Sequence, residues 1–390
     1  MKDKKSIAEL FRAKFGGNPH VYRAPGRVNL IGEHTDYNDG FVMPAALGFY
    51  CWIAAGRRDD EKLVVSSQEF SEQVTVDLNG QRLTPSRTWS DYSVGVASAL
   101  KEAGYRLKGT NMLVHGEVPI GAGLSSSASI EVATALALTE ESGLSVGRAR
   151  LAQICQKAEN EFVGMRCGIM DQFISLHGRA NHALMLDCRS LEYELVPIPE
   201  SVRLVICNTG VKHELSGGEY NVRREECEEA VRELSKALPE IRALRDVSLD
   251  QLDKHKGLLR EVIYKRAKHI VTENERVLKS VKCLRKGDLA QFGAYMAESH
   301  ASLRDDFEVS CTELDLMVEL ARHERGVHGS RLTGGGFGGS TINLVDAAHA
   351  AAFAENVAAG YEKKTGIRPV IYTCMPADGA SMVPAPEHAG

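Results

Sequence analysis

The ten residues from Pro119 to Ala128, Pro-Ile-Gly-Ala-Gly-Leu-Ser-Ser-Ser-Ala, combine two glycines with three hydroxyl side chains. Gly121 and Gly123 have no Cβ atom, so the backbone there can approach a ligand closely. An apolar run at 112–118 predicts a strand before the turn, and the serines predict a helix start after it. Because the N–H groups at a helix N-terminus attract anions, the pattern predicts a phosphate-binding turn. An ordinary serine-capped turn is the alternative.

This turn is not a Walker A loop. That motif carries Lys and then Ser or Thr directly after its last glycine. Here Leu124 follows Gly123, and Gly-Lys-Ser or Gly-Lys-Thr occurs nowhere in the chain. If a nucleotide binds, its site is of another kind.

A second group of polar residues lies near the N-terminus, within residues 26–40. It contains Arg27, Glu33, His34, Asp36 and Asn38 between glycines. Such side chains donate or accept several hydrogen bonds at once, which is what recognition of a polyhydroxylated substrate requires. A solvated turn stabilised by Asp and Asn is the alternative.

A glycine cluster, Thr-Gly-Gly-Gly-Phe-Gly-Gly-Ser, occupies residues 333–340. Five glycines in seven positions cost backbone entropy that stability alone does not justify. We therefore expect this backbone to pack closely beside a ligand or the phosphate turn, with a flexible hairpin-like link as the alternative. We expect the cluster to follow a helix and to precede a strand at 340–345.

The composition indicates a globular protein that acts on small molecules. With 390 residues, 43% hydrophobic and 25% charged, the chain is long enough for two domains. Its net charge of −5 and its lack of basic blocks argue against a nucleic-acid partner. There is no apolar run of membrane-spanning length and no signal-peptide core, so we expect no membrane association and a cytoplasmic location. Nine scattered cysteines without a Cys-x-x-Cys pair indicate reduced thiols.

The pattern of apolar residues predicts a mixed α/β protein in two parts. Strands are expected at 21–31, 49–55, 62–66, 112–118, 182–187 and 202–208. Helices are expected at 147–162, 219–238, 261–284, 311–323 and 347–359. We place the domain boundary near Pro197 and Pro199, giving domains 1–195 and 196–390. The Ala- and Pro-rich tail after Pro376 is expected to fray.

Four blocks of this chain, in order, resemble the signature segments of galactokinases, a family of the GHMP kinase superfamily. They are residues 26–40 (Gly-Arg-Val-Asn-Leu-Ile-Gly-Glu-His-Thr-Asp-Tyr-Asn-Asp-Gly), the phosphate turn at 121–127, residues 167–175 (Cys-Gly-Ile-Met-Asp-Gln-Phe-Ile-Ser) and the glycine cluster at 333–340. Residues 216–224 (Ser-Gly-Gly-Glu-Tyr-Asn-Val-Arg-Arg) also resemble a galactokinase segment. The resemblance spans residues 23–345.

The resemblance implies a general base, Asp171, that accepts the proton of the attacking sugar hydroxyl. It implies that Arg27 holds Asp171 ionised and stabilises charge on the transferred phosphoryl group. Without the resemblance, Asp171 would be interpreted as a helix N-cap. Sugar contacts are implied for Glu33, His34, Thr35, Asp36, Gly168 and Tyr220.

The resemblance also implies ATP and Mg²⁺. The nucleotide phosphates would bind Gly121, Ala122, Gly123, Leu124, Ser125, Ser126 and Ser127. Ser127 and Glu159 would be magnesium ligands, because hard oxygen atoms suit this ion; a solvated helix position is the alternative for Glu159. Ser66 and Trp89 are candidates for the adenine pocket, and a plain core position is the alternative for Trp89. The sequence Trp89-Ser-Asp-Tyr-Ser departs from the usual Trp-x-Asn-Tyr-Val at Asp91 and Ser93.

The implied fold is α+β with two lobes, an N-terminal lobe like ribosomal protein S5 domain 2 and a ferredoxin-like C-terminal lobe. The implied activity is transfer of the γ-phosphate of ATP to the C1 hydroxyl of α-D-galactose, the first committed step of galactose catabolism by the Leloir pathway. The alternatives are a kinase for a modified galactose such as N-acetylgalactosamine, and a non-catalytic sensor of galactose and ATP. We expect a monomer, with a weak dimer as the alternative.

Overall fold

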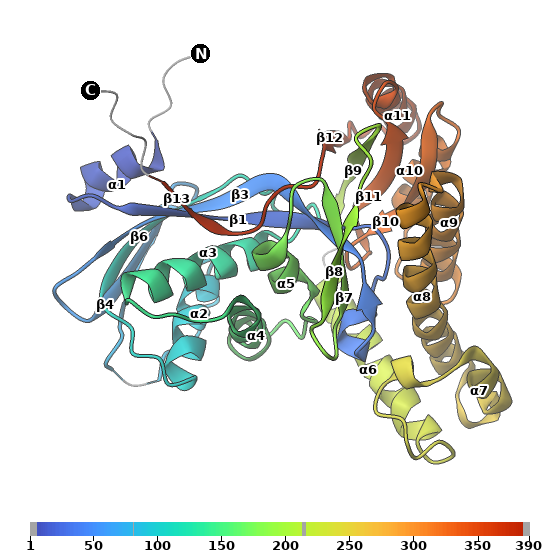
Figure 1. The fold of residues 1–390 in the computed structure, drawn as a ribbon, viewed down its shortest axis with the longest axis horizontal. Coiled ribbons are helices and arrows are strands. Elements are labelled where there is room, and N and C mark those ends of the chain that lie inside the picture. Colours follow the sequence, from blue (N-terminus) through green and yellow to red (C-terminus); the bar gives the residue numbers. More distant parts are fainter. Residues whose placement is uncertain (1–5, 81, 213–215, 385–390) are drawn as a thin grey trace.

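The computed structural model describes residues 6–80, 82–212 and 216–384 and arranges them in two lobes (Figure 1). Helices and strands are mixed in both lobes, as the sequence predicts. The first lobe is built on a six-stranded sheet of order β13-β1-β3-β6-β4-β5. Its strands are β1 (His20–Asn29), β3 (Pro44–Arg57), β4 (Lys62–Ser67), β5 (Gln73–Asp77), β6 (Thr110–Gly116) and β13 (Ser381–Val383).

Alternation along these strands divides their side chains between two apolar layers. Ile53 and Val114 belong to the main core of the lobe, whereas the neighbouring Ala54 and Leu113 pack against Phe11 of α1 (Ile7–Phe15). The main core lies between the sheet and helices on its other face (Figure 1). These are α2 (Asp91–Glu102), α3 (Ser126–Glu141), α4 (Arg148–Lys157) and α5 (Met170–His177).

The second lobe contains a four-stranded antiparallel sheet of order β10-β11-β9-β12. Its strands are β9 (Val202–Lys212), β10 (Val327–Thr333), β11 (Gly338–Asp346) and β12 (Val370–Cys374). The helices of this half are α6 (Ser216–Leu234), α7 (Leu249–Lys254), α8 (Glu261–Lys286), α9 (Leu289–Asp305), α10 (Thr312–Arg322) and α11 (Ala350–Thr365). Short helical turns are η1 (Asp36–Asn38), η2 (Ala158–Val163), η3 (Leu244–Asp246) and η4 (Lys256–Leu258).

The two lobes share one apolar core. A single cluster of buried residues joins Val28 and Leu124 of the first lobe to Ile342 and Val277 of the second. A small sheet of β2 (Phe41–Val42), β7 (His182–Asp187) and β8 (Tyr193–Pro197) lies beside this junction (Figure 1). Because shared apolar packing resists relative motion, it holds the segments on either side of the junction in a defined relation.

Three expectations are wrong in detail. The glycine cluster follows strand β10, not a helix, and connects it to β11. The helix expected at 147–162 ends as α4 at Lys157 and continues as the π-helical turn η2. The tail does not fray directly after Pro376, because β13 pairs with β1; residues 385–390 lie outside the described part.

The pairing of β13 also means that a single cut at 195/196 does not separate the two sheets, since Ser381–Val383 belongs to the sheet of the first lobe. The boundary itself stays a prediction. Within the described ranges, no helix is both long enough and apolar enough to cross a membrane.

Candidate active site

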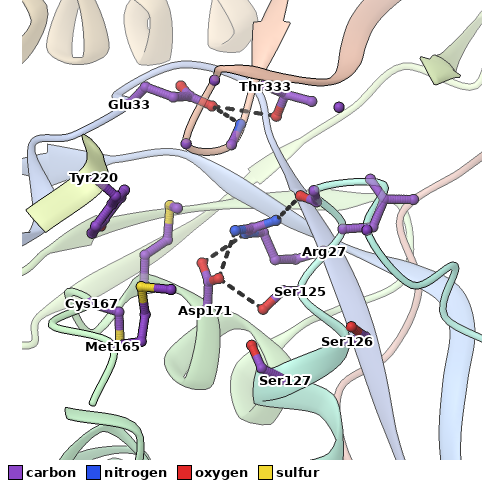
Figure 2. Close-up of a pocket in the computed structure, with 18 of the residues that line it drawn as sticks. Arg27, Glu33, Ser125, Ser126, Ser127, Met165, Cys167, Asp171, Tyr220 and Thr333 are labelled. Carbon is purple, nitrogen blue, oxygen red and sulfur yellow. Dashed lines mark hydrogen bonds and ion pairs between the residues drawn. The ribbon is translucent and has the colours of Figure 1, made fainter. Parts of the chain in front are cut away.

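A cavity of about 540 Å³ is lined by residues of both lobes. Its walls come from the phosphate turn, the loop after β1, the start of α5 and the glycine cluster. These are four of the segments singled out in the sequence, and the fold brings them together. Figure 2 shows how their side chains lie around this cavity.

The ion pair of Arg27 and Asp171 lies at the centre of the site. Arg27 Nε and Nη2 donate to the two carboxylate oxygens of Asp171 at 2.7 and 2.6 Å, and Nη1 donates to the carbonyl of Gly123 at 2.6 Å (Figure 2). Such a two-pronged contact fixes both planar groups. Burial alone would lower the pKa of Arg27, but the carboxylate of Asp171 outweighs burial and raises it. The guanidinium therefore stays charged between the base candidate and the phosphate turn.

Strand β1 is irregular where it presents Arg27. Its register against β3 shifts between Pro25 and Arg27, and such an irregularity can redirect a side chain. The backbone N–H of Arg27 donates to the carbonyl of Leu124 at 2.9 Å. A Cβ atom at Gly26 would lie 2.6 Å from that same oxygen, so the close approach of β1 to the phosphate turn requires glycine there.

Ser125 joins the phosphate turn to Asp171. Its hydroxyl donates to Asp171 Oδ2 at 2.8 Å (Figure 2). Ser125 has a φ of 62°, in the left-handed region, and makes no side-chain cap to α3. A non-glycine residue in this region costs roughly 1 kcal/mol or more, and such strain is concentrated at functional sites. The first turn of α3 contains no acidic residue, which suits its N–H groups to a phosphate.

The glycine cluster packs against the phosphate turn, as predicted. Ser340 donates its hydroxyl to the carbonyl of Ala122 at 2.6 Å. A Cβ atom at Gly334 would lie 3.2 Å from the carbonyl oxygen of Gly123, and one at Gly336 would lie 2.2 Å from that of Val309. Because both glycines also have φ near 80°, side chains there would be strained; one at Gly334 would press against the phosphate turn, and one at Gly336 would press against Val309.

Glu33 connects the loop after β1 to the glycine cluster. Its carboxylate accepts hydrogen bonds from Asn29 Nδ2 at 2.8 Å and from the N–H of Gly334 at 3.0 Å, and forms an ion pair with Arg331. The side chain lines the cavity but is 1% exposed. Burial raises its pKa, and Arg331 opposes this. The contacts of Glu33 in the structure are thus with protein groups that hold the cluster in place.

His34 and Tyr220 form an aromatic wall of the cavity. Their ring centroids lie 5.4 Å apart, and both residues line the space. The ring of His34 also reaches the hydroxyl of Tyr37 at 2.9 Å. Burial, supported by the nearby His269, lowers the pKa of His34 to about 3, so its ring is neutral at physiological pH.

Asp36 lines the cavity near Asp171, at the start of η1. Burial, followed by repulsion from Asp171, raises its pKa to about 6. A Cβ atom at Gly168 would lie only 2.0 Å from Asp36 Oδ2, so only glycine fits there. Gly168 therefore packs its backbone against Asp36, the carboxylate for which we predict a sugar contact.

Five predicted ligand contacts lie outside the cavity lining: Ala122 and Gly168, described above, and Thr35, Ser66 and Trp89. The hydroxyl of Thr35 is fully buried within reach of the carbonyls of Gly32 and Phe41, at 2.8 and 2.6 Å. Ser66 is buried and donates to Gln73 at 3.0 Å. Trp89 stacks on Phe70 and packs against the core of the first lobe. In the structure these residues contact other protein groups. Their roles in ligand binding stay predictions.

The two departures from the usual Trp-x-Asn-Tyr-Val pattern also have structural contacts. Asp91 accepts hydrogen bonds from the N–H of Ser86 at 2.9 Å and of Arg87 at 2.6 Å, which fixes the chain before α2. Ser93 is buried and shares a hydrogen bond of 3.0 Å with Thr134 of α3. Neither residue lines the cavity.

The structure brings Ser127 and Glu159 together. Burial, followed by the charge of Asp171, raises the pKa of Glu159, and the nearby hydroxyl of Ser127 opposes this rise. Glu159 belongs to η2, and π-helical turns are frequent at functional sites. Among the residues that the structure describes, no group of three or more His, Cys, Asp and Glu side chains is placed to hold a metal. Two hard oxygen donors fit an ion such as Mg²⁺, which keeps waters and phosphate oxygens as its other ligands.

Sequence reasoning missed several residues of this site. Tyr92, Met165 and Cys167 line the cavity, but single aromatic or sulfur-containing residues carry no signal that separates a wall from a core. Arg331 is fully buried. The signal that could have found it is a charged residue two positions before the glycine cluster.

Comparison with known proteins first identifies the class of protein to which this chain belongs. Family models for the N-terminal and C-terminal domains of GHMP kinases match residues 91–179 and 280–363. The two-lobed fold and the phosphate turn at the cavity are therefore those of a GHMP kinase.

The narrower family follows from four further matches. The galactokinase galactose-binding signature matches residues 9–57. A galactokinase of Roseiflexus sp. (strain RS-1) is 46% identical over 98% of this chain and 98% of its own, and one of Chloroflexus aurantiacus is 45% identical over 99% and 100%. The crystal structure of Lactococcus lactis galactokinase complexed with galactose superposes with a TM-score of 0.93 and 37% identity over 97% of this chain and 99% of that one. The chain belongs to the galactokinase family and is a phosphotransferase.

Proposed function

We propose that the protein transfers the γ-phosphoryl group of ATP to the C1 hydroxyl of α-D-galactose, giving galactose 1-phosphate and ADP. The observation that carries the proposal is the contact of Arg27 with both Asp171 and Gly123. It places a base candidate and a phosphate turn on either side of one guanidinium, in a cavity lined by the galactose-binding signature.

Asp171 has capacity left for a substrate hydroxyl. A carboxylate has about four lone-pair positions. In the described structure Oδ2 accepts from Arg27 and Ser125, whereas Oδ1 accepts only from Arg27. The side chain is 21% exposed toward the cavity. Oδ1 is therefore the atom that we assign to accept the proton of the C1 hydroxyl as its oxygen attacks the γ-phosphorus.

On the phosphate side, the main requirements are positioning and stabilisation of charge, because the transition state of phosphoryl transfer is loose. The N–H groups at the start of α3 would orient the phosphates. Arg27 is fixed by Asp171 and Gly123, so it would stabilise the transferring group without reorganisation.

On the sugar side, Asp36 offers a carboxylate acceptor, and His34 and Tyr220 offer an aromatic surface with polar edges. Glu33 would act by holding the glycine cluster, since protein groups already satisfy its carboxylate. Ser127 and Glu159 would hold Mg²⁺. When bound, the ion neutralises charge on the nucleotide phosphates.

The test is an assay of ADP release with galactose, glucose, N-acetylgalactosamine and mevalonate, each with ATP. We expect turnover with galactose, and phosphorus-31 NMR of the product should show coupling of phosphorus to the anomeric proton. Turnover with mevalonate or glucose but not galactose would reject the proposed substrate. Turnover with N-acetylgalactosamine at a similar kcat/KM would support the modified-sugar alternative.

The assignment of the base is tested with Asp171→Asn. We expect kcat to fall by at least about 100-fold, the usual contribution of general base catalysis, while calorimetry still detects galactose binding. Asp39→Asn is the control, because its half-exposed carboxylate, paired with Arg189, lies on the same loop as Asp36 but outside the cavity lining. Near-normal turnover of Asp171→Asn would refute the assignment and leave the substrate proposal standing.

We also propose a cytoplasmic location and a monomeric enzyme. All nine cysteines are free, and four of them, Cys51, Cys155, Cys207 and Cys227, are buried. Unpaired thiols are typical of proteins in a reducing compartment. Size-exclusion chromatography with light scattering would test the oligomeric state.

A further inference from the structure

Glu131 is an acidic residue that the mechanism above does not use. It lies on α3, four residues after Ser127, and is completely buried. Its Oε2 accepts a hydrogen bond from Gln172 Nε2 at 3.0 Å, and its Oε1 has no hydrogen-bond partner among the described residues. It forms no ion pair with any cation in that part of the chain, so burial raises its pKa well above the ordinary value, with a further contribution from Glu159.

The amide of Gln172 bridges two carboxylates. Its Nε2 also donates to Glu159 Oε2 at 2.6 Å. An amide nitrogen carries two hydrogens, and this geometry assigns one to Glu131 and one to Glu159. Glu159 Oε2 accepts in addition from the thiol of Cys167 at 3.2 Å. The amide thus fixes the orientation of the carboxylate that we assign as a metal ligand.

Stability does not explain Glu131. A buried acid with one unsatisfied oxygen costs folding free energy, and an apolar side chain of similar size would avoid this cost. The residue does have an effect on orientation, because a carboxylate accepts hydrogen bonds. Its Oε2 can accept from the amide whether or not Oε1 carries a proton, so Glu131 favours the NH₂ end of Gln172, and not its carbonyl oxygen, between the two acids.

We propose that Glu131 is a positioning residue, which acts through Gln172 to hold Glu159 in the orientation that binds a divalent cation together with Ser127. Helix α3 then supplies both the ligand hydroxyl and the support for the partner ligand, since Ser127 and Glu131 are neighbours at i and i+4 on one helix face. The inference rests on the proposed metal site. Groups behind metal ligands typically contribute about 10- to 100-fold in metal affinity.

The test measures binding of Mn²⁺ to the protein with ADP and without sugar, by electron paramagnetic resonance of the free ion. We expect Glu131→Leu to raise the Kd for Mn²⁺ about tenfold while its resistance to urea unfolding is unchanged or higher. Glu131→Gln keeps a carbonyl oxygen that can accept from Gln172, so it should recover part of the affinity. Thr134→Val is the matched control, a fully buried position of the same helix whose hydroxyl contacts only Ser93 in the described structure, and it should leave the Kd unchanged.

Glu159→Gln separates this inference from the metal assignment itself. It should weaken Mn²⁺ binding more than Glu131→Leu does, and the double variant should bind no more weakly than Glu159→Gln alone. If Glu159→Gln weakens binding and Glu131→Leu does not, the positioning inference is wrong and the metal site stands. If neither variant changes the Kd, both are wrong. If Glu131→Leu lost both affinity and stability, and Thr134→Val lost both as well, the effect would be a general one and the inference would also be overturned.

Discussion

The carboxylate of Asp36 lowers the stability of the folded protein at neutral pH. Its pKa rises from 3.8 to about 6 because the group is buried and Asp171 is nearby. A rise of this size corresponds to about 3 kcal/mol. The folded state binds this proton more tightly than the unfolded chain, so the contribution of Asp36 to stability is greatest at low pH and is lost as the pH rises through about 6.

The perturbation is Asp36→Asn, which removes the titrating charge and keeps the shape. By the same linkage, the variant should be more stable than the wild type by about 0.5 kcal/mol at pH 4 and by about 3 kcal/mol at pH 7.5. Galactose affinity should fall about 10- to 100-fold, the contribution of a hydrogen bond to a charged group. The gain in stability and the loss in binding have the same cause, a carboxylate held in place for a ligand.

The assay is urea unfolding of the ligand-free proteins at several pH values, together with calorimetry of galactose binding. Only the difference in the free energy of unfolding between variant and wild type is used, because the contributions of the other titrating groups then cancel. Asp39→Asn, in the same loop, is the control and should change stability by no more than about 0.5 kcal/mol. If the free energies of unfolding of Asp36→Asn and wild type differed by the same amount at pH 4 and at pH 7.5, the reasoning would be refuted.

Three further changes test the surroundings of the base. Arg27→Gln should lower kcat about 10²- to 10³-fold, because it removes a fixed stabilising charge and frees Asp171 from its two-pronged contact; steady-state kinetics with unchanged kcat would contradict this. Ser125→Gly should leave thermal stability unchanged or raised, since glycine tolerates a φ of 62°, while the loss of its hydrogen bond lowers kcat about tenfold. Gly168→Ala should weaken galactose binding measured by calorimetry, because its methyl group would lie 2.0 Å from Oδ2 of Asp36, for which we predict a sugar contact; Gly48→Ala, where a Cβ atom meets nothing within 4 Å, should not.

Much of the regular structure could be predicted from apolar periodicity. The strand expected at 182–187 is β7, and the helix expected at 261–284 is α8 with two more residues. Apolar periodicity did not predict every helix. Helix α9 (Leu289–Asp305) was missed, although Asp288 caps its start by accepting from the N–H of Gln291. The π-helical turn at Glu159 was also missed, because one extra residue in a turn leaves the apolar spacing almost unchanged.

The candidate site was predictable in parts. The phosphate turn follows from glycines and serines alone, but the pairing of Arg27 with Asp171 joins residues 144 positions apart and came from the family resemblance. The engagement of Glu33 by Arg331 and Gly334 could not be predicted from spacing, since hydrogen bonds across two lobes depend on how the sheets pack. The sugar contact that the resemblance implies for Thr35 stays a prediction; in the structure its hydroxyl lies within hydrogen-bond distance of two carbonyls of its own loop.

The strand β13 makes the beginning and the end of the chain depend on each other. It pairs Ser381–Val383 with Arg23–Val21 at the edge of β1, the same strand that carries Arg27 to the cavity. During synthesis the chain emerges from its N-terminus, so this edge stays open until Ser381–Val383 leaves the ribosome. A stop codon before Ser381 would leave an unpaired β1 edge available to other chains, and such a truncated product should show faster amide exchange at Val21 and Arg23. Translation of residues 381–383 is in this sense the step that completes the sheet whose strand β1 carries Arg27 to the cavity.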